Sequence, residues 1–325
     1  MIKRVIKRVL GGLRCSMGML KDIGPLIVAY HRFTDIRLRY DIKGTVSNGI
    51  SADFSEEIDF LSKTFRIISM DELVAGMGDP LGLRGTAVLT FDDGYRDNYE
   101  YVYPVLKRHK VAASLFVTCN IIDNKDMLWF DRVGFLFGKL PAGEYKVPVL
   151  EKVWVPVKNK KWASILFAES LKVLKKEWSD EIIGCLEKAA GVRLDEFLFR
   201  KLNLYLSSRE IKEMSADGIC VGSHTLSHCI LNKVSTEIAE SEMIQSKRIL
   251  ESITGRSVDY FSYPDGKIEE ADLYLADMAK RCGYKAAVTT NFGLNRNLSY
   301  AGALTLKRVS GGQNFFDFRY NISKW

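Results

Sequence analysis

The chain has 325 residues, of which 47% are hydrophobic and 27% are charged. These values are typical of globular proteins and exclude a disordered protein, a collagen-like rod and a small disulfide-stapled scaffold. The formal net charge is +7, but residues 1–21 hold six basic and no acidic residues, and the rest of the chain is almost neutral. A basic surface for nucleic acid is therefore not expected.

The first 25 residues predict a basic amphipathic helix. Ile2, Val5, Ile6, Val9, Leu10 and Leu13 share one helical face, and lysines and arginines lie off that face. Through residues 1–20 this helix either contacts an anionic membrane surface or docks on its own domain. Arg14 interrupts the apolar stretch and no cleavage site is clear, so the segment does not read as a secretory signal. We expect a cytoplasmic protein, placed at the inner face of the membrane if the helix binds lipid.

The six cysteines form no C-x-x-C pair. They are expected to be reduced thiols, with an oxidised framework as the weaker alternative.

From residue 26 onward, short apolar runs alternate with helical periodicity. The expected strands are 26–30, 87–91, 113–118, 219–222, 260–263 and 286–290, and the expected helices are 54–65, 71–77, 95–109, 236–254 and 268–282. This alternation predicts a parallel sheet, either covered by helices on both faces or closed into a barrel.

Residues 119–206 interrupt the alternation. They contain an expected hairpin over 145–157 and expected helices over 162–176 and 179–190. We interpret the stretch as an insertion in one loop of a single catalytic domain, residues 26–325. It either caps the site or serves as an assembly surface.

Polar side chains follow the expected strands at the point where each strand ends. His31 follows the first strand, Asp92-Asp93-Gly94 follow the second, His224 to His228 follow another, and Asp265 follows Pro264. In parallel α/β folds the carboxyl ends of the strands carry the active site. The fourth histidine, His109, follows two basic residues at a helix end and is expected to be solvated.

Two histidines and one carboxylate predict a metal site. His224 and His228 are four residues apart, which lets both rings reach one ion from a helical turn. Alone, the histidine pair or the Asp-Asp-Gly turn is more often structural. Together they form a set that leaves coordination positions open, as a catalytic zinc ion requires. Such an ion acidifies bound water to a pKa of about 7 and polarises a carbonyl, and the remaining Asp92 can act as a base.

Three motifs resemble those of the polysaccharide deacetylases, carbohydrate esterase family four. They are Thr90-Phe91-Asp92-Asp93-Gly94, His224-Thr225-Leu226-Ser227-His228 and Phe261-Ser262-Tyr263-Pro264-Asp265-Gly266. The resemblance runs from residue 26 to residue 309, with 119–206 as a subgroup insertion. It implies an α/β fold, a distorted (β/α) barrel of about seven parallel strands with an inserted α+β segment.

The resemblance also implies roles for single residues. Asp92 corresponds to the general base, and Asp93, His224 and His228 to the ligands of a divalent metal, with zinc favoured over cobalt, nickel or iron. The hydroxyl of Thr225 is expected to hold the metal-binding loop, and the main-chain N–H of Asp265 to stabilise the oxyanion.

The chain departs from the family pattern at three places. Ser262 stands where many members have Arg, Asp265 replaces an aromatic residue, and Leu306-Lys307-Arg308 replaces a late Leu-x-His. Tyr30-His31 is similar to the early motif of enzymes that deacetylate poly-N-acetylglucosamine, in which the histidine is the general acid. We therefore expect His31 to protonate the leaving amine, with a buried structural histidine as the alternative.

Arg308 is expected to replace the missing arginine beside Asp92 and keep it ionised, with Arg132 as a rival. Four aromatic residues near these loops line either the substrate cleft or the core: Tyr95, Trp129, Phe130 and Tyr263.

The expected function is metal-dependent hydrolysis of the N-acetyl group of an amino sugar in glycan biosynthesis. The substrate would be a polysaccharide, an O-antigen or a lipid-linked intermediate. The alternatives are a deformylase acting on a lipid-linked amino sugar and a non-catalytic carbohydrate-binding relative.

Overall fold

The computed structural model describes residues 24–33, 51–266, 273–295, 298–312 and 314–323. The expected N-terminal helix lies outside the described residues, apart from its last two positions. Among the helices that are described, none is both long enough and apolar enough to cross a membrane. The five cysteines of the described part are free thiols.

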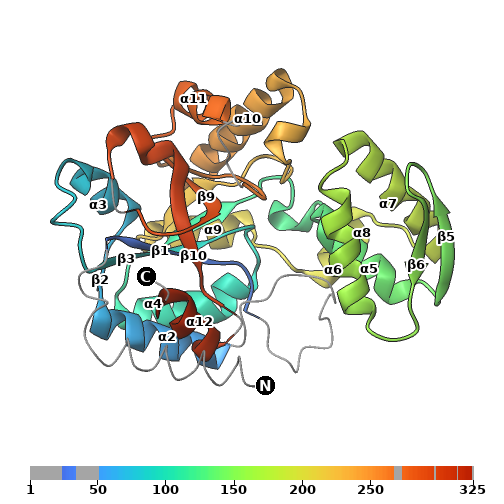
Figure 1. Ribbon diagram of the computed structural model, residues 1–325, viewed down its shortest axis with the longest axis horizontal. Helices are drawn as coiled ribbons and strands as arrows, with labels where there is room; N and C mark the ends of the chain where they lie inside the picture. Colours follow the sequence, from blue (N-terminus) through green and yellow to red (C-terminus); the bar gives the residue numbers. More distant parts are fainter. Residues whose placement is uncertain (1–23, 34–50, 267–272, 296–297, 313, 324–325) are drawn as a thin grey trace.

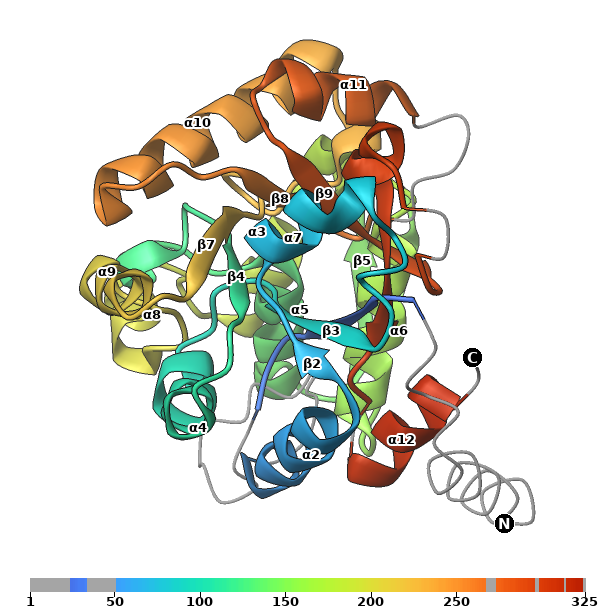
Figure 2. The same cartoon turned by 90° about the vertical axis from the view of Figure 1, so that its left-hand side faces the viewer.

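Seven parallel strands close into a barrel, as predicted (Figure 2). The sheet order is β1-β10-β9-β8-β7-β4-β3-β2, and a further pairing of β1 with β3 closes the ring and leaves β2 outside it. The strands are β1 Leu26–Tyr30, β2 Arg66–Ile67, β3 Thr86–Phe91, β4 Ser114–Val117, β7 Cys220–Ser223, β8 Tyr260–Ser262, β9 Ala286–Phe292 and β10 Leu306–Ser310.

Two of these strands were not expected. β2 has only two residues and pairs with the start of β3, whereas β4 pairs with the end of β3. β10 carries Lys307 and Arg308 in a five-residue strand, so its apolar pattern is weak. Its pairing with β1 and β9 nevertheless completes the barrel.

Helices surround the barrel, in the positions shown in Figure 2. They are α2 Ser51–Thr64, α3 Met70–Ala75, α4 Tyr103–His109, α9 Ser208–Ala216, α10 Thr236–Thr254, α11 Leu273–Arg281 and α12 Phe315–Ser323. The helix predicted over 95–109 is wrong at its start: a π-helical turn, Asn98–Val102, precedes α4. Tyr95 instead forms an antiparallel bridge with Tyr205.

Alternate residues of the strands pack on opposite faces. Leu26, Val28 and Tyr30 join the large apolar cluster beneath the outer helices, whereas Ile27 joins a second cluster with Val88 of β3. Side chains of α3 belong to that second cluster, and α3 lies across the near end of the barrel in Figure 2. The opposite end, where the strands have their carboxyl ends, is left for a site.

Most of the stretch between β4 and β7, up to α8, forms a compact group of elements beside the barrel (Figure 1). These are α5 Trp129–Lys139, β5 Gly143–Val147, β6 Glu151–Val155, α6 Lys160–Leu171, α7 Lys176–Ala190 and α8 Glu196–Leu202. The predicted hairpin is confirmed as the antiparallel pair of β5 and β6. An apolar cluster of their own, which includes Leu136, Val155 and Ile182, holds α5, β5, β6, α6 and α7 together, whereas Phe199 of α8 packs in a separate cluster with Tyr95 and Tyr205.

The helix predicted over 162–176 is wrong at its end. α6 stops at Leu171, whose carbonyl oxygen accepts a hydrogen bond from the Ser179 hydroxyl at 3.2 Å. The same carbonyl also accepts the Leu174 N–H at 3.0 Å, so two bonds replace the intrahelical partner that it loses at the end of the helix. Lys172 then turns its side chain toward the barrel.

Candidate active site

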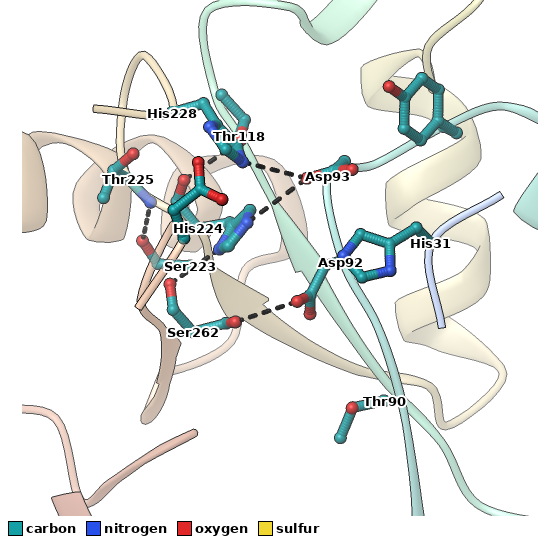
Figure 3. A network of polar contacts seen from close by, with 12 residues as sticks. His31, Thr90, Asp92, Asp93, Thr118, Ser223, His224, Thr225, His228 and Ser262 are labelled. Carbon is teal, nitrogen blue, oxygen red and sulfur yellow. Dashed lines mark hydrogen bonds and ion pairs between the residues drawn. The ribbon is translucent and has the colours of Figure 1, made fainter. Parts of the chain in front are cut away.

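The chain turns sharply where β3 ends. Asp93 and Gly94 have φ values of 75° and 91°, in the left-handed region that favours glycine. The Asp92 N–H still donates to the Tyr30 carbonyl at 2.9 Å, so Asp92 keeps its place beside β1. The turn gives the two neighbouring carboxylates different surroundings, as Figure 3 shows.

Asp93, His224 and His228 are brought together as the metal hypothesis requires (Figure 3). One ligand atom from each lies within 4.8 Å of the others, and all three residues are buried. Asp93 Oδ1 is 3.4 Å from Nε2 of His224 and 3.3 Å from Nε2 of His228. The three come from the ends of β3 and β7, which are separated in the ring only by β4.

The donor set fits a divalent metal. His224 Nδ1 is 2.7 Å from the Ser262 carbonyl oxygen, which places the proton on Nδ1 and leaves the Nε2 lone pair free for an ion. Asp93 Oδ1 is buried, and no donor of the described residues meets it with hydrogen-bond geometry. Burial opposes the charge of Asp93, but His224 and His228 hold the pKa of its carboxyl well below the usual value.

The loop after β7 has a strained backbone at this site. Thr225 and His228 have φ values of 66° and 57°, which non-glycine residues adopt rarely and mostly where surrounding contacts impose them. Glu242 of α10 supplies those contacts: its carboxylate accepts the N–H groups of Leu226 and Ser227, each at 2.8 Å, and the Ser227 hydroxyl at 2.6 Å.

The expected role of the Thr225 hydroxyl is wrong. This oxygen is buried and has no hydrogen-bond partner among the described residues. The main chain of Thr225 makes the contacts instead: its N–H donates to Ser223 Oγ at 3.3 Å, and its carbonyl accepts the Cys119 N–H at 3.2 Å.

Asp92 is held by Arg308 and not by the rival Arg132. The Arg308 guanidinium donates to both carboxylate oxygens of Asp92, at 2.8 and 2.6 Å, and its Nε donates to the Thr289 carbonyl at 2.8 Å. Arg132 instead binds Asp126. Burial alone would raise the pKa of Asp92, but the charge and hydrogen bonds of Arg308, together with the nearby His224, lower the pKa below its usual value.

A cavity of about 100 Å³ opens over these groups. From the barrel it is lined by side chains that follow β1, β3, β7 and β8, among them His31, Asp92, His224 and Asp265, and by Thr290 of β9. His31 is half-buried, and its ring lies beside Asp92 in Figure 3. The far wall comes from α6 and the residue that follows it: Ile165, Ala168, Glu169 and Lys172.

Lys172 is a site residue that the sequence analysis missed. Its Nζ lies 2.5 Å from Asp265 Oδ1 and 2.9 Å from Glu169 Oε1. Lys172 and Asp265 are 93 positions apart in the chain, and no motif links them. Asp265 has a φ of 49°, and its own N–H makes no hydrogen bond within the described part of the chain.

The four aromatic candidates have different positions. Phe130 and Tyr263 line the 100 Å³ cavity, and Phe130 packs edge-on against the His228 ring, with centroids 5.1 Å apart. Trp129 lines a second, neighbouring cavity. Tyr95 is a core residue: it is fully buried, and its hydroxyl donates to Asp131 at 2.7 Å.

The sequence pattern of the polysaccharide deacetylase family matches residues 83–146 and 157–287. This match covers more than half of the chain and every motif around the cavity except His31 and Arg308. The chain belongs to the polysaccharide deacetylase family, whose members are hydrolases that act on carbon–nitrogen bonds.

Individual relatives agree with this assignment. YxkH of Bacillus subtilis (strain 168) is 24% identical over 227 residues, which are 70% of this chain and 52% of that protein. The chain therefore spans about half the length of that relative. Two solved structures share the fold at 18% identity. They are the deacetylase PplD of Streptococcus pyogenes, with a TM-score of 0.56 over 89% of this chain and 92% of its own, and IcaB from Ammonifex degensii, with 0.54 over 93% and 98%.

Proposed function

We propose that this protein removes the N-acetyl group of an amino sugar by metal-dependent hydrolysis. One observation carries the proposal: two adjacent carboxylates have separate partners in one cavity. Asp93 faces two histidines, and Asp92 is paired with Arg308. A carbohydrate-binding protein would have no need for a second, ionised carboxylate beside a metal site.

Asp93, His224 and His228 would hold the divalent ion, and zinc suits this mixed nitrogen and oxygen set best. When bound, the ion would acidify a water molecule and polarise the amide carbonyl of the substrate. Asp92 would accept the proton of the attacking water, and Arg308 would keep Asp92 in its carboxylate form between turnovers.

His31 would donate a proton to the leaving amine. It lines the same cavity as Asp92, and in Figure 3 its ring lies on the side of Asp92 away from His224. The Asp265 N–H would donate a hydrogen bond to the oxyanion, and loss of such a donor typically costs about 3 kcal/mol of transition-state stabilisation. The ion pair with Lys172 holds the loop that presents this N–H.

We further propose a role in glycan biosynthesis in the cytoplasm, with residues 1–20 touching the inner face of the membrane. The free thiols of the described part agree with a reducing compartment. Deletion of residues 1–20 should reduce binding to anionic vesicles, and equal binding of both forms would contradict the membrane contact.

The Asp92→Asn variant tests the proposed reaction. Wild-type protein should release amine from an N-acetylated sugar, and the variant should lose at least about a hundredfold in kcat, within the usual contribution of a general base. Metal content and sugar binding should persist. A matched N-formyl sugar in the same assay tests the deformylase alternative, and equal turnover by the variant would contradict the role of Asp92.

A further inference from the structure

The chain that follows β1 is bonded to the chain that follows β3 at three consecutive residues. The Asn98 side-chain N–H donates to the His31 carbonyl at 3.1 Å. Asp97 accepts the Arg32 Nε–H at 2.9 Å and also the main-chain N–H of Phe33. Because β1 and β3 are paired in the barrel, these bonds keep the two segments together beyond the ends of the strands.

The ion pair of Asp97 and Arg32 is buried. The two side chains are 7% and 8% exposed, and the guanidinium lies over the Tyr95 ring, 4.6 Å from its centroid. Burial raises the pKa of Asp97 to about 6 although Arg32 opposes the rise, so the pair is ionised above that pH. A guanidinium that is both paired and stacked has little freedom to move, and it fixes the chain directly after His31.

The main chain of Asn98 is bonded on both sides. Its N–H donates to the Tyr95 carbonyl at 3.1 Å, and its carbonyl accepts the Tyr103 N–H. The second of these bonds belongs to the π-helical turn that begins at Asn98. Turns of this kind are rare and are often found at functional sites. The side-chain amide of Asn98 therefore reaches His31 from a fixed position.

Packing alone does not account for an asparagine at this position. Asn98 is 1% exposed. Among the residues that the structure describes, its Nδ2 donates to His31 and its Oδ1 meets no donor. A buried polar atom without a partner destabilises the folded chain, and a leucine of similar size would avoid that cost. The bond to the His31 carbonyl is what the amide contributes.

This bond acts on a residue of the 100 Å³ cavity. His31 lines the cavity, and its ring lies beside Asp92 in Figure 3, whereas Asn98 is not part of the lining. The imidazole follows any movement of the main chain to which it is attached. Proton transfer needs heavy atoms about 2.6 to 3.2 Å apart, and a displacement of about 1 Å can cost about a hundredfold in rate.

We propose that Asn98 is a positioning residue for the proton donor: its amide fixes the main chain at His31 and so holds the imidazole beside Asp92. The pair of Asp97 and Arg32 fixes the residue that follows. The imidazole then gives its proton to the amine nitrogen as the bond from that nitrogen to the acyl carbon breaks. This inference rests on the proposed function, because it takes His31 as the proton donor.

A double-mutant cycle in the full-length protein tests the inference, with amine release from the tetramer of N-acetylglucosamine as the readout. Asn98→Leu keeps the size of the side chain and should lower kcat about tenfold with little change in KM. In a His31→Ala background the same substitution should change kcat by less than about twofold, because the group that it positions is gone. Asn98→Ala is the second variant, and thermal melting shows whether each protein is folded.

Asn124→Leu is the matched control. Asn124 is also buried, and its amide donates to the Tyr205 carbonyl at 3.1 Å, away from His31. Its kcat should stay within about twofold of the wild type in both backgrounds.

Three results would overturn the inference: an equal loss from Asn98→Leu in both backgrounds, wild-type kcat in the folded Asn98 variants, or wild-type kcat in His31→Ala. The proposed function fails in a different way, since the wild type would then release no amine from the tetramer. Amine release by the wild type together with an equal loss in both backgrounds would contradict only the positioning role of Asn98.

Discussion

Asp92 and Asp93 are neighbours in the chain, but their carboxylates have different partners in the fold. Asp93 faces two imidazoles, and Asp92 faces a guanidinium that is itself fixed by the Thr289 carbonyl. Adjacent residues in a strand point to opposite faces, and the left-handed turn at Asp93 lets both carboxylates serve one cavity. This separation is the physical basis for assigning them different roles.

We expect Arg308, the partner of Asp92, to determine the acidic limb of the pH dependence of kcat/KM. Arg308 lowers the pKa of Asp92 against the effect of burial. Asp92 is therefore an ionised base at pH values above this lowered pKa, and it becomes protonated and inactive as the pH falls through it. Arg308→Met should therefore move the acidic limb of kcat/KM upward by about 1 to 3 pH units, and Arg308→Lys by less. The measurement is the pH dependence of kcat/KM for amine release.

An acidic limb that stays in place in Arg308→Met would contradict this role. The variant leaves Asp92 buried without its partner, which typically costs about 3 to 5 kcal/mol of stability. Thermal melting at each pH therefore accompanies the kinetics. Arg132→Met serves as the matched control, because Arg132 binds Asp126 and should leave the limb unchanged.

The residues of the site could largely be predicted from the sequence, since strand ends in a parallel fold converge. Asp92, Asp93, His31, His224 and His228 each follow an apolar run, and the structure places them in one cavity. Lys172 and Glu242 could not be predicted, because each meets the site only through tertiary packing. The sequence around each of them shows helical periodicity but no motif that predicts a contact with the barrel.

At the scale of elements, α10 acts as the support of the loop after β7. Glu242 satisfies two main-chain N–H groups of that loop and one hydroxyl, although the loop has two residues with left-handed φ. Without this carboxylate the loop would have buried donors with no acceptor, and each such donor costs about 1 to 3 kcal/mol. The positions of His224 and His228 therefore depend on α10, which also contacts the end of β7, where the hydroxyls of Ser246 and Ser223 are 2.7 Å apart.

Glu242→Ala should weaken metal binding by about 10- to 100-fold, the usual effect of removing a group that orients metal ligands. Glu242→Gln should recover part of the affinity, because its amide oxygen still accepts hydrogen bonds. Competition with a metal chelator measures the affinity. Glu240→Ala on the same helix is the matched control, since Glu240 is paired with Arg281 at the surface. Wild-type affinity in Glu242→Ala would contradict the supporting role.

The ends of helices and strands are harder to predict from the sequence than their existence. The expected helix 95–109 failed at its start because Tyr95 buries its ring and bonds to Asp131 rather than continuing a helix. Strand β10 was missed because the inward position that would normally be apolar carries Arg308. Arg308 is also the residue that pairs with Asp92, the proposed general base.

At the scale of the whole molecule, the barrel could be predicted and the placement of 119–206 could not. Continuous apolar strands between helices indicate a parallel sheet, and the family motifs narrow it to this barrel. The position of an insertion depends on which surfaces pack against each other, and the spacing of apolar residues in the sequence does not show this. The structure sets α6 over the carboxyl ends of the strands, so the inserted elements form one wall of the 100 Å³ cavity and much of the lining of the neighbouring cavity, which measures about 280 Å³.

Asp93, His224 and His228 are proposed to form a catalytic metal site. The most direct measurement is the amount of bound divalent metal per chain in the wild type, in His228→Ala and in His109→Ala, after incubation with zinc, cobalt or nickel. We predict about one ion per chain in the wild type and in His109→Ala, whose histidine lies at the end of α4 beside Asp59. His228→Ala should lose the ion while keeping its fold by circular dichroism. No bound metal in the wild type, or full retention of the ion in His228→Ala, would contradict a metal site at these three residues.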